Sequence, residues 1–157
     1  MGFDRETPDV NVAGIQVRVA DDDDLTFVGQ DGYVATEVLR RKIAAGEVLI
    51  AESEGMAVGY LRLEFLWSSI PYIALVRVDE RSRRRGVGRA LVQFVEQQLL
   101  ARGHSVLYSS AQANEPEPQA WHRRMGFKEC GIIAGINRGD IGEIFFRKRL
   151  AWNERKE

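Results

Sequence analysis

Residues 76–89 read VRVDERSRRRGVGR, and this stretch joins an apolar segment to an amphipathic one. Backbone N–H groups at the start of a helix have no intrahelical partners, and the helix dipole adds partial positive charge there. Gly86 and Gly88 have no Cβ atoms, so phosphate oxygens can approach the main chain. Further positive charge comes from Arg81, Arg83, Arg84, Arg85 and Arg89. The spacing therefore predicts a cradle for a diphosphate.

Other anion-binding loops have different spacings. The stretch lacks the G-x-x-x-x-G-K-[ST] sequence of nucleoside triphosphatases and the G-x-G-x-x-G sequence of dinucleotide-binding folds. A nucleic-acid surface is disfavoured because the basic cluster is short and has no aromatic stacking residues nearby. A plain helix start with solvated arginines stays open as the alternative interpretation of this turn.

The segments on both sides of the turn have clear periodicity. Tyr72–Val78 is almost continuously apolar, which is typical of a buried central strand. After the turn, apolar residues recur with helical spacing at Val87, Leu91, Val95 and Leu99. Gly103 ends this helix, and Val106–Tyr108 follows as a strand. Residues 72–108 therefore form a crossover that joins two parallel strands.

The rest of the chain adds more strands than helices. Strands are expected at residues 15–20, 48–51, 57–67, 127–134 and 143–150. A helix should end at Gly46, and Pro116–Met125 should form a second, short helix. This order predicts an α/β (α+β) fold, with one mixed sheet of about six to seven strands and helices on both faces.

Length and composition predict one globular domain. The chain has 157 residues, of which 45% are hydrophobic and 29% charged, and its net charge is -1. This charge gives no general attraction to nucleic acid or anionic membranes, and no apolar run reaches the roughly 18 residues of a membrane span. The lone Cys130 fits a reducing compartment, so a cytoplasmic location is expected. We expect a partly ordered leader at residues 1–14, the functional domain at 15–150 and a polar tail at 151–157.

Two motifs, in this order along the chain, resemble those of a known family. Arg83-x-x-Gly86-x-Gly88, placed between an apolar strand and an amphipathic helix, resembles the coenzyme A-binding motif of the GNAT superfamily of N-acetyltransferases. Residues 121–127, WHRRMGF, resemble the family's aromatic-rich helix that ends in Gly-Phe. The resemblance covers residues 15–150. It implies an N-acetyltransferase that uses acetyl-coenzyme A and no metal.

The resemblance also implies where the coenzyme would bind. In this family the central parallel strands are splayed, and the pantetheine arm would lie along the main chain of Val76, Arg77 and Val78. A main-chain N–H there would polarise the thioester carbonyl. The diphosphate would lie against Arg83, Arg84, Arg85, Gly86, Val87, Gly88 and Arg89. Asn114 matches the position of an asparagine that bonds the coenzyme.

The reaction implied by the resemblance is direct attack of a deprotonated amine on the thioester. The family's usual tyrosine, four residues before the Gly of Gly-Phe, is replaced here by His122. An imidazole with an ordinary pKa of about 6.5 suits acid or base work. Tyr108 is the alternative proton donor, and Glu64 is the candidate base. Each of these three could instead be an ordinary packing or surface residue, and Cys130 has no histidine spaced to activate it as a nucleophile.

The acceptor is expected to be a primary amine of a small molecule or peptide. Its pocket would form from the early helices, the Trp67–Tyr72 loop and the Gly135–Gly142 connection, with apolar walls from Tyr33, Trp67 and Tyr72. We expect neither nucleic acid nor a membrane as a partner, and a homodimer is one option for the oligomeric state. The alternative function is a sensor or regulatory module that holds acyl-coenzyme A without turnover, because two residues that the resemblance leads us to expect are missing: the usual tyrosine, and the glutamate that some relatives have where this chain reads Tyr108-Ser109-Ser110.

Overall fold

The computed structural model describes residues 1–151, so the tail predicted at 151–157 lies outside the described residues except for Ala151. The strands are β1 (Val10–Val12), β2 (Ile15–Val19), β3 (Val48–Ser53), β4 (Met56–Leu66), β5 (Ile70–Val78), β6 (Val106–Gln112), β7 (Lys128–Asn137) and β8 (Ile141–Arg149). The helices are α1 (Leu25–Val28), α2 (Thr36–Ala44), α3 (Val87–Ala101) and α4 (Pro116–Arg124), with short 3-10 turns η1 (Asp22–Asp24) and η2 (Glu80–Ser82).

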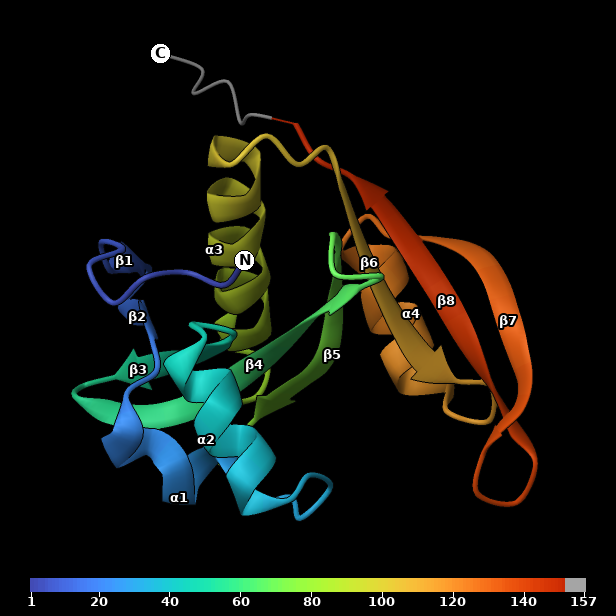
Figure 1. Cartoon of the computed structure of the whole chain (residues 1–157), viewed down its shortest axis with the longest axis horizontal. Helices are drawn as coiled ribbons and strands as arrows, with labels where there is room; N and C mark the ends of the chain where they lie inside the picture. Colours follow the sequence, from blue (N-terminus) through green and yellow to red (C-terminus); the bar gives the residue numbers. More distant parts are fainter. Residues whose placement is uncertain (152–157) are drawn as a thin grey trace.

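All eight strands within this range form one sheet, in the order β1-β2-β3-β4-β5-β6-β8-β7. Neighbouring strands are antiparallel except β5 and β6, which are parallel. Helices α3 and α4 cover one face of the sheet, and α1 and α2 cover the other face near β3 and β4 (Figure 1). No helix within residues 1–151 is long and apolar enough to cross a membrane.

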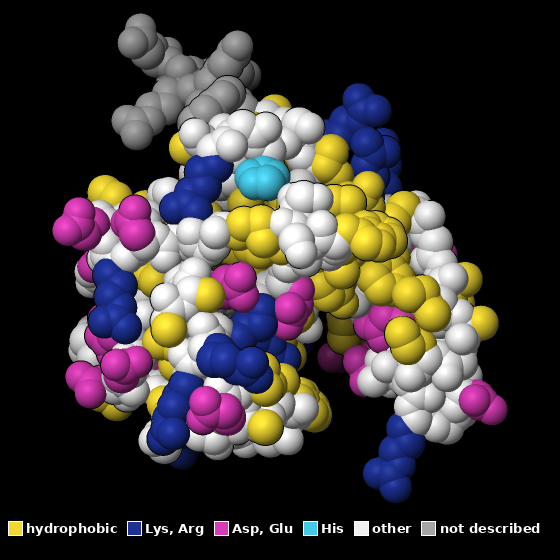
Figure 2. Space-filling view, viewed as in Figure 1, with side chains coloured by type: hydrophobic (Ala, Val, Ile, Leu, Met, Phe, Trp, Pro, Cys, Tyr) yellow, Lys and Arg dark blue, Asp and Glu magenta, His cyan; other side chains and the backbone are white. Residues whose placement is uncertain are grey.

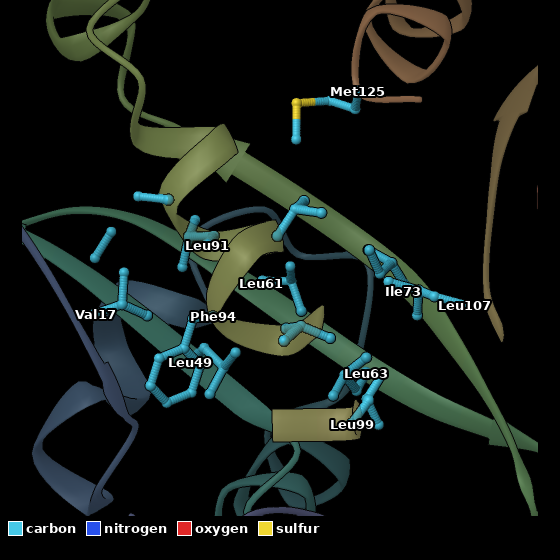
Figure 3. Close-up of a cluster of buried hydrophobic side chains, with 14 of the residues drawn as sticks. Val17, Leu49, Leu61, Leu63, Ile73, Leu91, Phe94, Leu99, Leu107 and Met125 are labelled. Atoms are coloured by element: carbon cyan, nitrogen blue, oxygen red, sulfur yellow. The ribbon is translucent and has the colours of Figure 1, made fainter. Parts of the chain in front are cut away.

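The main core lies between α3 and strands β2 to β5. One stripe of α3 is fully buried, with Leu91, Val95 and Leu99 facing the sheet, as its helical spacing predicts. These side chains pack against Leu61 and Leu63 of β4 and against other apolar residues of the sheet (Figure 3). Because each buried leucine contributes about 1.5–3 kcal/mol, this contact fixes α3, and therefore its first residues, relative to β5.

A second apolar cluster holds α1 and α2 against the opposite face of the sheet. Leu39 and Ile43 of α2 pack with Val48 and Ile50 of β3 and with the ring of Tyr60 on β4. The successive residues of a strand point to opposite faces, so Leu61 faces α3 while Tyr60 faces α2. Two independent clusters therefore set the direction of every side chain along β4.

The predicted fold class is confirmed, including the mixed sheet, the helices on both faces and the splayed parallel strands. The sheet has eight strands instead of the expected six to seven. The additional strand is β1, whose three exposed residues pair with β2 inside the segment expected to be a leader. Three residues are too few to give a visible alternation of apolar and polar side chains. Phe3, in the same segment, is buried in the main core.

Candidate active site

The turn between β5 and α3 has a backbone suited to an anion. Arg84 has φ 63° and Gly86 has φ 80°, and Gly86 is the N-cap of α3 without any side-chain cap. The first helical hydrogen bond is donated by the N–H of Ala90 to the carbonyl of Gly86. The N–H groups of Val87, Gly88 and Arg89 precede that bond and point out of the helix start, where the dipole favours a negative ligand.

The two glycines of the turn are required for different reasons. Gly86 has φ 80°, a backbone conformation that favours glycine, and a Cβ added there would meet nothing within 4 Å, so the space above it is open to a ligand. A Cβ on Gly88 would lie 3.3 Å from Cζ2 of Trp121. Gly88 therefore allows α4 to pack close to the start of α3, a role that the sequence did not suggest.

Positive charge surrounds the turn without being neutralised by the chain. The five arginines at positions 81, 83, 84, 85 and 89 are all exposed, and no ion pair between described residues includes them. Exposed charges attract a ligand over a distance more than they hold it, so the N–H groups must supply the close contacts. Together, the open backbone and the arginines fit the diphosphate of a coenzyme.

Strands β5 and β6 part just before this turn. They pair only at Tyr72 with Tyr108 and at Ile73 with Ser109, after which β6 continues along β8 and β5 continues along β4 (Figure 1). The register between β4 and β5 skips one residue, Ala74, at the same place. The edge of β5 from residue 74 to residue 78 therefore faces an opening instead of a neighbouring strand. No feature of the sequence predicts this bulge, because a bulge depends on strand pairing.

The opening reaches the face of the sheet that carries α1 and α2. Figure 2 shows a deep notch there, between the part of the molecule that contains α1 and α2 and the part that contains β7 and β8. Acidic and basic side chains gather along its walls. By strand alternation Glu64, Tyr72 and Tyr108 face this side, since their neighbours Leu63, Ile73 and Leu107 are buried in the main core.

Glu64 and the two tyrosines lie side by side across three strands. Glu64 pairs with Tyr72, and Tyr72 pairs with Tyr108. The Glu64 carboxylate lies 2.9 Å from Nζ of Lys42 on α2, and its side chain is 44% exposed. The structure thus brings together two of the predicted catalytic residues, Glu64 and Tyr108, at the point where β5 and β6 part.

Tyr72 has the more developed environment of the two tyrosines. Its hydroxyl is hydrogen-bonded to Oγ of Ser110 on β6, and its ring stacks on Phe145 of β8 with 5.8 Å between centroids. Burial raises the pKa of Tyr72, and the negative charges of Glu143 and Glu64 add to this increase. The sequence suggested Tyr72 only as a wall of the pocket and did not suggest Ser110, since their contact depends on the register of two parallel strands.

His122 belongs to α4, and its side chain points from this helix toward the other side of the sheet. Its side chain is buried, with Nε2 2.7 Å from Oγ of Ser109 and Nδ1 2.6 Å from the carbonyl oxygen of Pro118. A carbonyl can only accept, so Nδ1 carries the proton and Nε2 accepts from the Ser109 hydroxyl. The ring also stacks on Phe146, and burial lowers the pKa of His122. The contacts fix α4 against β6, and burial disfavours the charged imidazolium although the hydrogen bond to Pro118 opposes this effect.

The remaining predicted residues are scattered. Asn114 is exposed in the connection between β6 and α4. Tyr33 and Trp67, which the sequence suggested as walls of an apolar pocket, are 74% and 85% exposed. Cys130 is a free thiol on the exposed strand β7. The candidate polar groups at the splayed strands are thus Glu64 on β4, Tyr72 on β5 and Tyr108 on β6.

Comparisons with known proteins agree with this arrangement. The model of the Acetyltransferase (GNAT) family matches residues 16–127. Probable N-acetyltransferase 14 of Danio rerio is 32% identical over 102 residues, which are 64% of this chain and only 36% of that relative. The chain therefore spans about a third of the length of this curated relative.

Two solved structures have the same fold along almost their whole length. The ribosomal-protein-alanine N-acetyltransferase of Brucella melitensis is 25% identical, with TM-score 0.72, covering 85% of this chain and 99% of that one. The structure of yncA from Salmonella typhimurium, which includes its cofactor acetyl-coenzyme A, is 17% identical, with TM-score 0.72 and coverage of 92% and 98%. The family model, which covers most of the described chain, shows that this protein belongs to the Acetyltransferase (GNAT) family.

Proposed function

We propose that this chain transfers an acetyl group from acetyl-coenzyme A to a primary amine of a small molecule or peptide, by direct attack of the amine. One observation carries this proposal: the free edge of β5 leads directly into the arginine-glycine turn at the start of α3. A long ligand with a diphosphate at one end and an extended arm at the other fits both features at once. The proposed transferase unit comprises residues 15–150.

The chain's own residues would hold the coenzyme at two places. We assign the diphosphate to the turn residues 83–89, and the extended arm to the main chain of Val76, Arg77 and Val78 on the free edge of β5. Asn114 is a further proposed contact. When bound, acetyl-coenzyme A supplies an activated thioester. An N–H group on the free edge of β5 would polarise the carbonyl of that thioester.

Proton handling is assigned to the polar face of the sheet. Glu64 would accept the proton of the incoming amine, directly or through water, because its carboxylate is partly exposed beside the opening. We add Tyr72 to the predicted donor Tyr108, since the Tyr72 hydroxyl lies where β5 and β6 part. Its raised pKa keeps a proton on the phenolic oxygen at neutral pH. The role of His122 as proton donor remains a prediction, which its two hydrogen-bonded ring nitrogens support less well.

Calorimetric titration with acetyl-coenzyme A tests the binding half of this proposal. We expect binding in the low micromolar range, and a weaker interaction with dephospho-coenzyme A, which lacks the 3′-phosphate, if the arginines also hold that phosphate of acetyl-coenzyme A. Release of free thiol in the presence of a panel of primary amines then tests the transfer half. A protein that shows no binding of acetyl-coenzyme A would contradict the assignment of the turn.

A second function is favoured by the environment of His122. The residue that replaces the family's usual tyrosine is buried and has no free ring nitrogen, as expected for a module that binds acyl-coenzyme A without turnover. Tight binding of acetyl-coenzyme A, with no thiol release for any amine in the panel, would favour this alternative over the transferase.

A further inference from the structure

Arg62 is a buried cation in the middle of β4. Its side chain is buried, and the residue is only 7% exposed. Among the described residues, three buried side-chain nitrogens have no hydrogen-bond partner: Nε and Nη1 of Arg62 and Nε of Arg147. Arg147 is the less buried of the two and lies on β8, on the far side of the opening. Buried guanidinium donors are normally paired, so the two unpaired nitrogens of Arg62 call for an explanation.

The direction of the Arg62 side chain follows from its neighbours on β4. Leu61 and Leu63 are buried in the core beneath α3, so Arg62 faces the opposite side with Tyr60 and Glu64. The contact between Glu64 and Lys42 of α2 confirms which side this is. Arg62 therefore lies on the same face of the sheet as Tyr72 and the notch.

No acidic residue within residues 1–151 forms an ion pair with Arg62. Its partners on the adjacent strands are Val48 and Leu75, which are both apolar. The acidic groups along this face are engaged elsewhere. Asp31 accepts from the hydroxyl of Tyr60, whereas Glu64 and Glu47 both contact Lys42. The guanidinium thus keeps unused donors that are buried away from bulk water, where a charge-assisted hydrogen bond is strong.

The position of Arg62 relates it to the proposed transfer site. Leu75, its partner on β5, directly follows Ala74, the residue that the register skips where β5 leaves β6. Adjacent strands lie roughly 5 Å apart, so the Arg62 backbone is one strand away from the free edge of β5. Glu64 is two residues along the same face, roughly 7 Å away. A cation and a carboxylate therefore stand at separate points beside the opening.

We propose that Arg62 binds a carboxylate of the acceptor, so that the acceptor is an amine that also carries a carboxylate, such as an amino acid or a short peptide. This inference rests on the proposed transferase function. The planar guanidinium matches a carboxylate in a bidentate geometry, and Glu64 attracts the ammonium end of the same molecule. Arg62 acts here as a residue that determines specificity and takes no part in the bond changes.

A pair of acceptors that differ only in one charge tests this proposal. Initial rates are measured for a dipeptide and for its C-terminal amide, with wild type, Arg62→Met and Arg40→Gln. Arg40 is an exposed residue of α2, so its replacement removes the same charge from the same region. We expect wild type and Arg40→Gln to favour the free carboxylate at least about tenfold in kcat/KM, and Arg62→Met to lose this preference.

Stability separates recognition from a structural role. Replacing a buried, unpaired arginine by an apolar residue of similar volume is often neutral or stabilising, so Arg62→Met should unfold at the same temperature as wild type or higher. Equal rates for the two acceptors in wild type, or an unchanged preference in Arg62→Met, would overturn the proposal.

The failure of the transferase function itself would look different. It would appear as binding of acetyl-coenzyme A without turnover of either acceptor. Calorimetric titration with the N-acetylated dipeptide then decides the role of Arg62 independently of turnover. Binding by wild type that is at least tenfold weaker in Arg62→Met supports the role, whereas equal affinities overturn it.

Discussion

The two faces of strands β4 and β5 differ in what they contribute to the molecule. Beneath α3, the side chains of Leu61, Leu63 and Ile73 are fully or almost fully buried among other apolar residues. On the opposite face, the same strands carry Arg62, which has two unpaired buried nitrogens, and Tyr72, whose hydroxyl is hydrogen-bonded to Ser110. Alternate residues of one strand therefore serve two different purposes.

This difference separates stability from chemistry. On the face beneath α3, the side chains of β4 and β5 make apolar contacts with the helix. These contacts also fix the start of α3, where the coenzyme is proposed to bind. The opposite face keeps charged and polar groups that the chain pairs only in part. We therefore expect substitutions on the first face to change folding or coenzyme binding, and substitutions on the second to change turnover and acceptor choice.

The largest effect is expected for Gly86→Glu. Any side chain at φ 80° is strained, and a glutamate would place negative charge in the open space above the turn. We expect the affinity for acetyl-coenzyme A, measured by calorimetry, to fall more than about a thousandfold, which corresponds to about 4 kcal/mol. Binding of the N-acetylated dipeptide at Arg62 should persist, because it depends on the other face.

Gly103→Glu provides the matched control for that substitution. Gly103 lies just beyond the other end of α3, also has a positive φ of 85°, and also has nothing within 4 Å of an added Cβ. The two variants should therefore lose similar amounts of stability. Coenzyme affinity that is unchanged in Gly86→Glu, or reduced equally in both variants, would remove the turn from the proposed site.

Leu61→Ala tests the apolar face. The leucine is fully buried between β4 and α3, so its truncation should lower the free energy of unfolding by about 3 kcal/mol. Chemical denaturation measures this change. At temperatures where the variant is folded, its preference for a carboxylate-bearing acceptor should match that of wild type. A lost preference with intact stability would contradict the separation of the two faces.

The sequence is sufficient to predict the apolar face but not the whole site. The spacing of Val87, Leu91, Val95 and Leu99 identifies α3, and the arginine-glycine turn identifies its functional end, because both signals lie within a few consecutive residues. The bulge at Ala74 depends on how β4 and β5 align, and the contact between Tyr72 and Ser110 joins residues 38 positions apart on β5 and β6. Local patterns contain no information about such a register.

His122 also shows that a local sequence pattern does not predict the contacts of a side chain. Its place before Gly126-Phe127 predicts a proton donor only through the family resemblance, whereas its contacts depend on Ser109 of β6 and Phe146 of β8. Similarly, the alternation along β4 shows that Arg62 and Glu64 share a face, but only the packing shows that one is paired and the other is not.

Tyr72→Phe tests the polar face. Loss of the hydroxyl that bonds Ser110 should reduce kcat about a hundredfold if Tyr72 supplies a proton, with little change in the affinity for acetyl-coenzyme A. Tyr108→Phe is the matched comparison, because Tyr108 pairs with Tyr72 on the adjacent strand. A full kcat in Tyr72→Phe with a reduced kcat in Tyr108→Phe would return the role of donor to Tyr108.

The smallest effect is expected for His122→Phe, and it depends on pH. Burial lowers the pKa of His122 in the folded protein, so the unfolded chain, with a pKa of about 6.5, takes up the proton first as the pH falls. The histidine therefore contributes stability that is lost progressively below about pH 6.5.

Because phenylalanine cannot titrate, the advantage of wild type over His122→Phe in free energy of unfolding should shrink between about pH 8 and about pH 5. Urea denaturation of both proteins across that range measures the difference. The kcat of the variant at neutral pH should change little, since the His122 side chain packs between α4 and β6, on the face of the sheet opposite Tyr72. A constant stability difference combined with a much lower kcat would instead make His122 the proton donor and move part of the chemistry to the other face of the sheet.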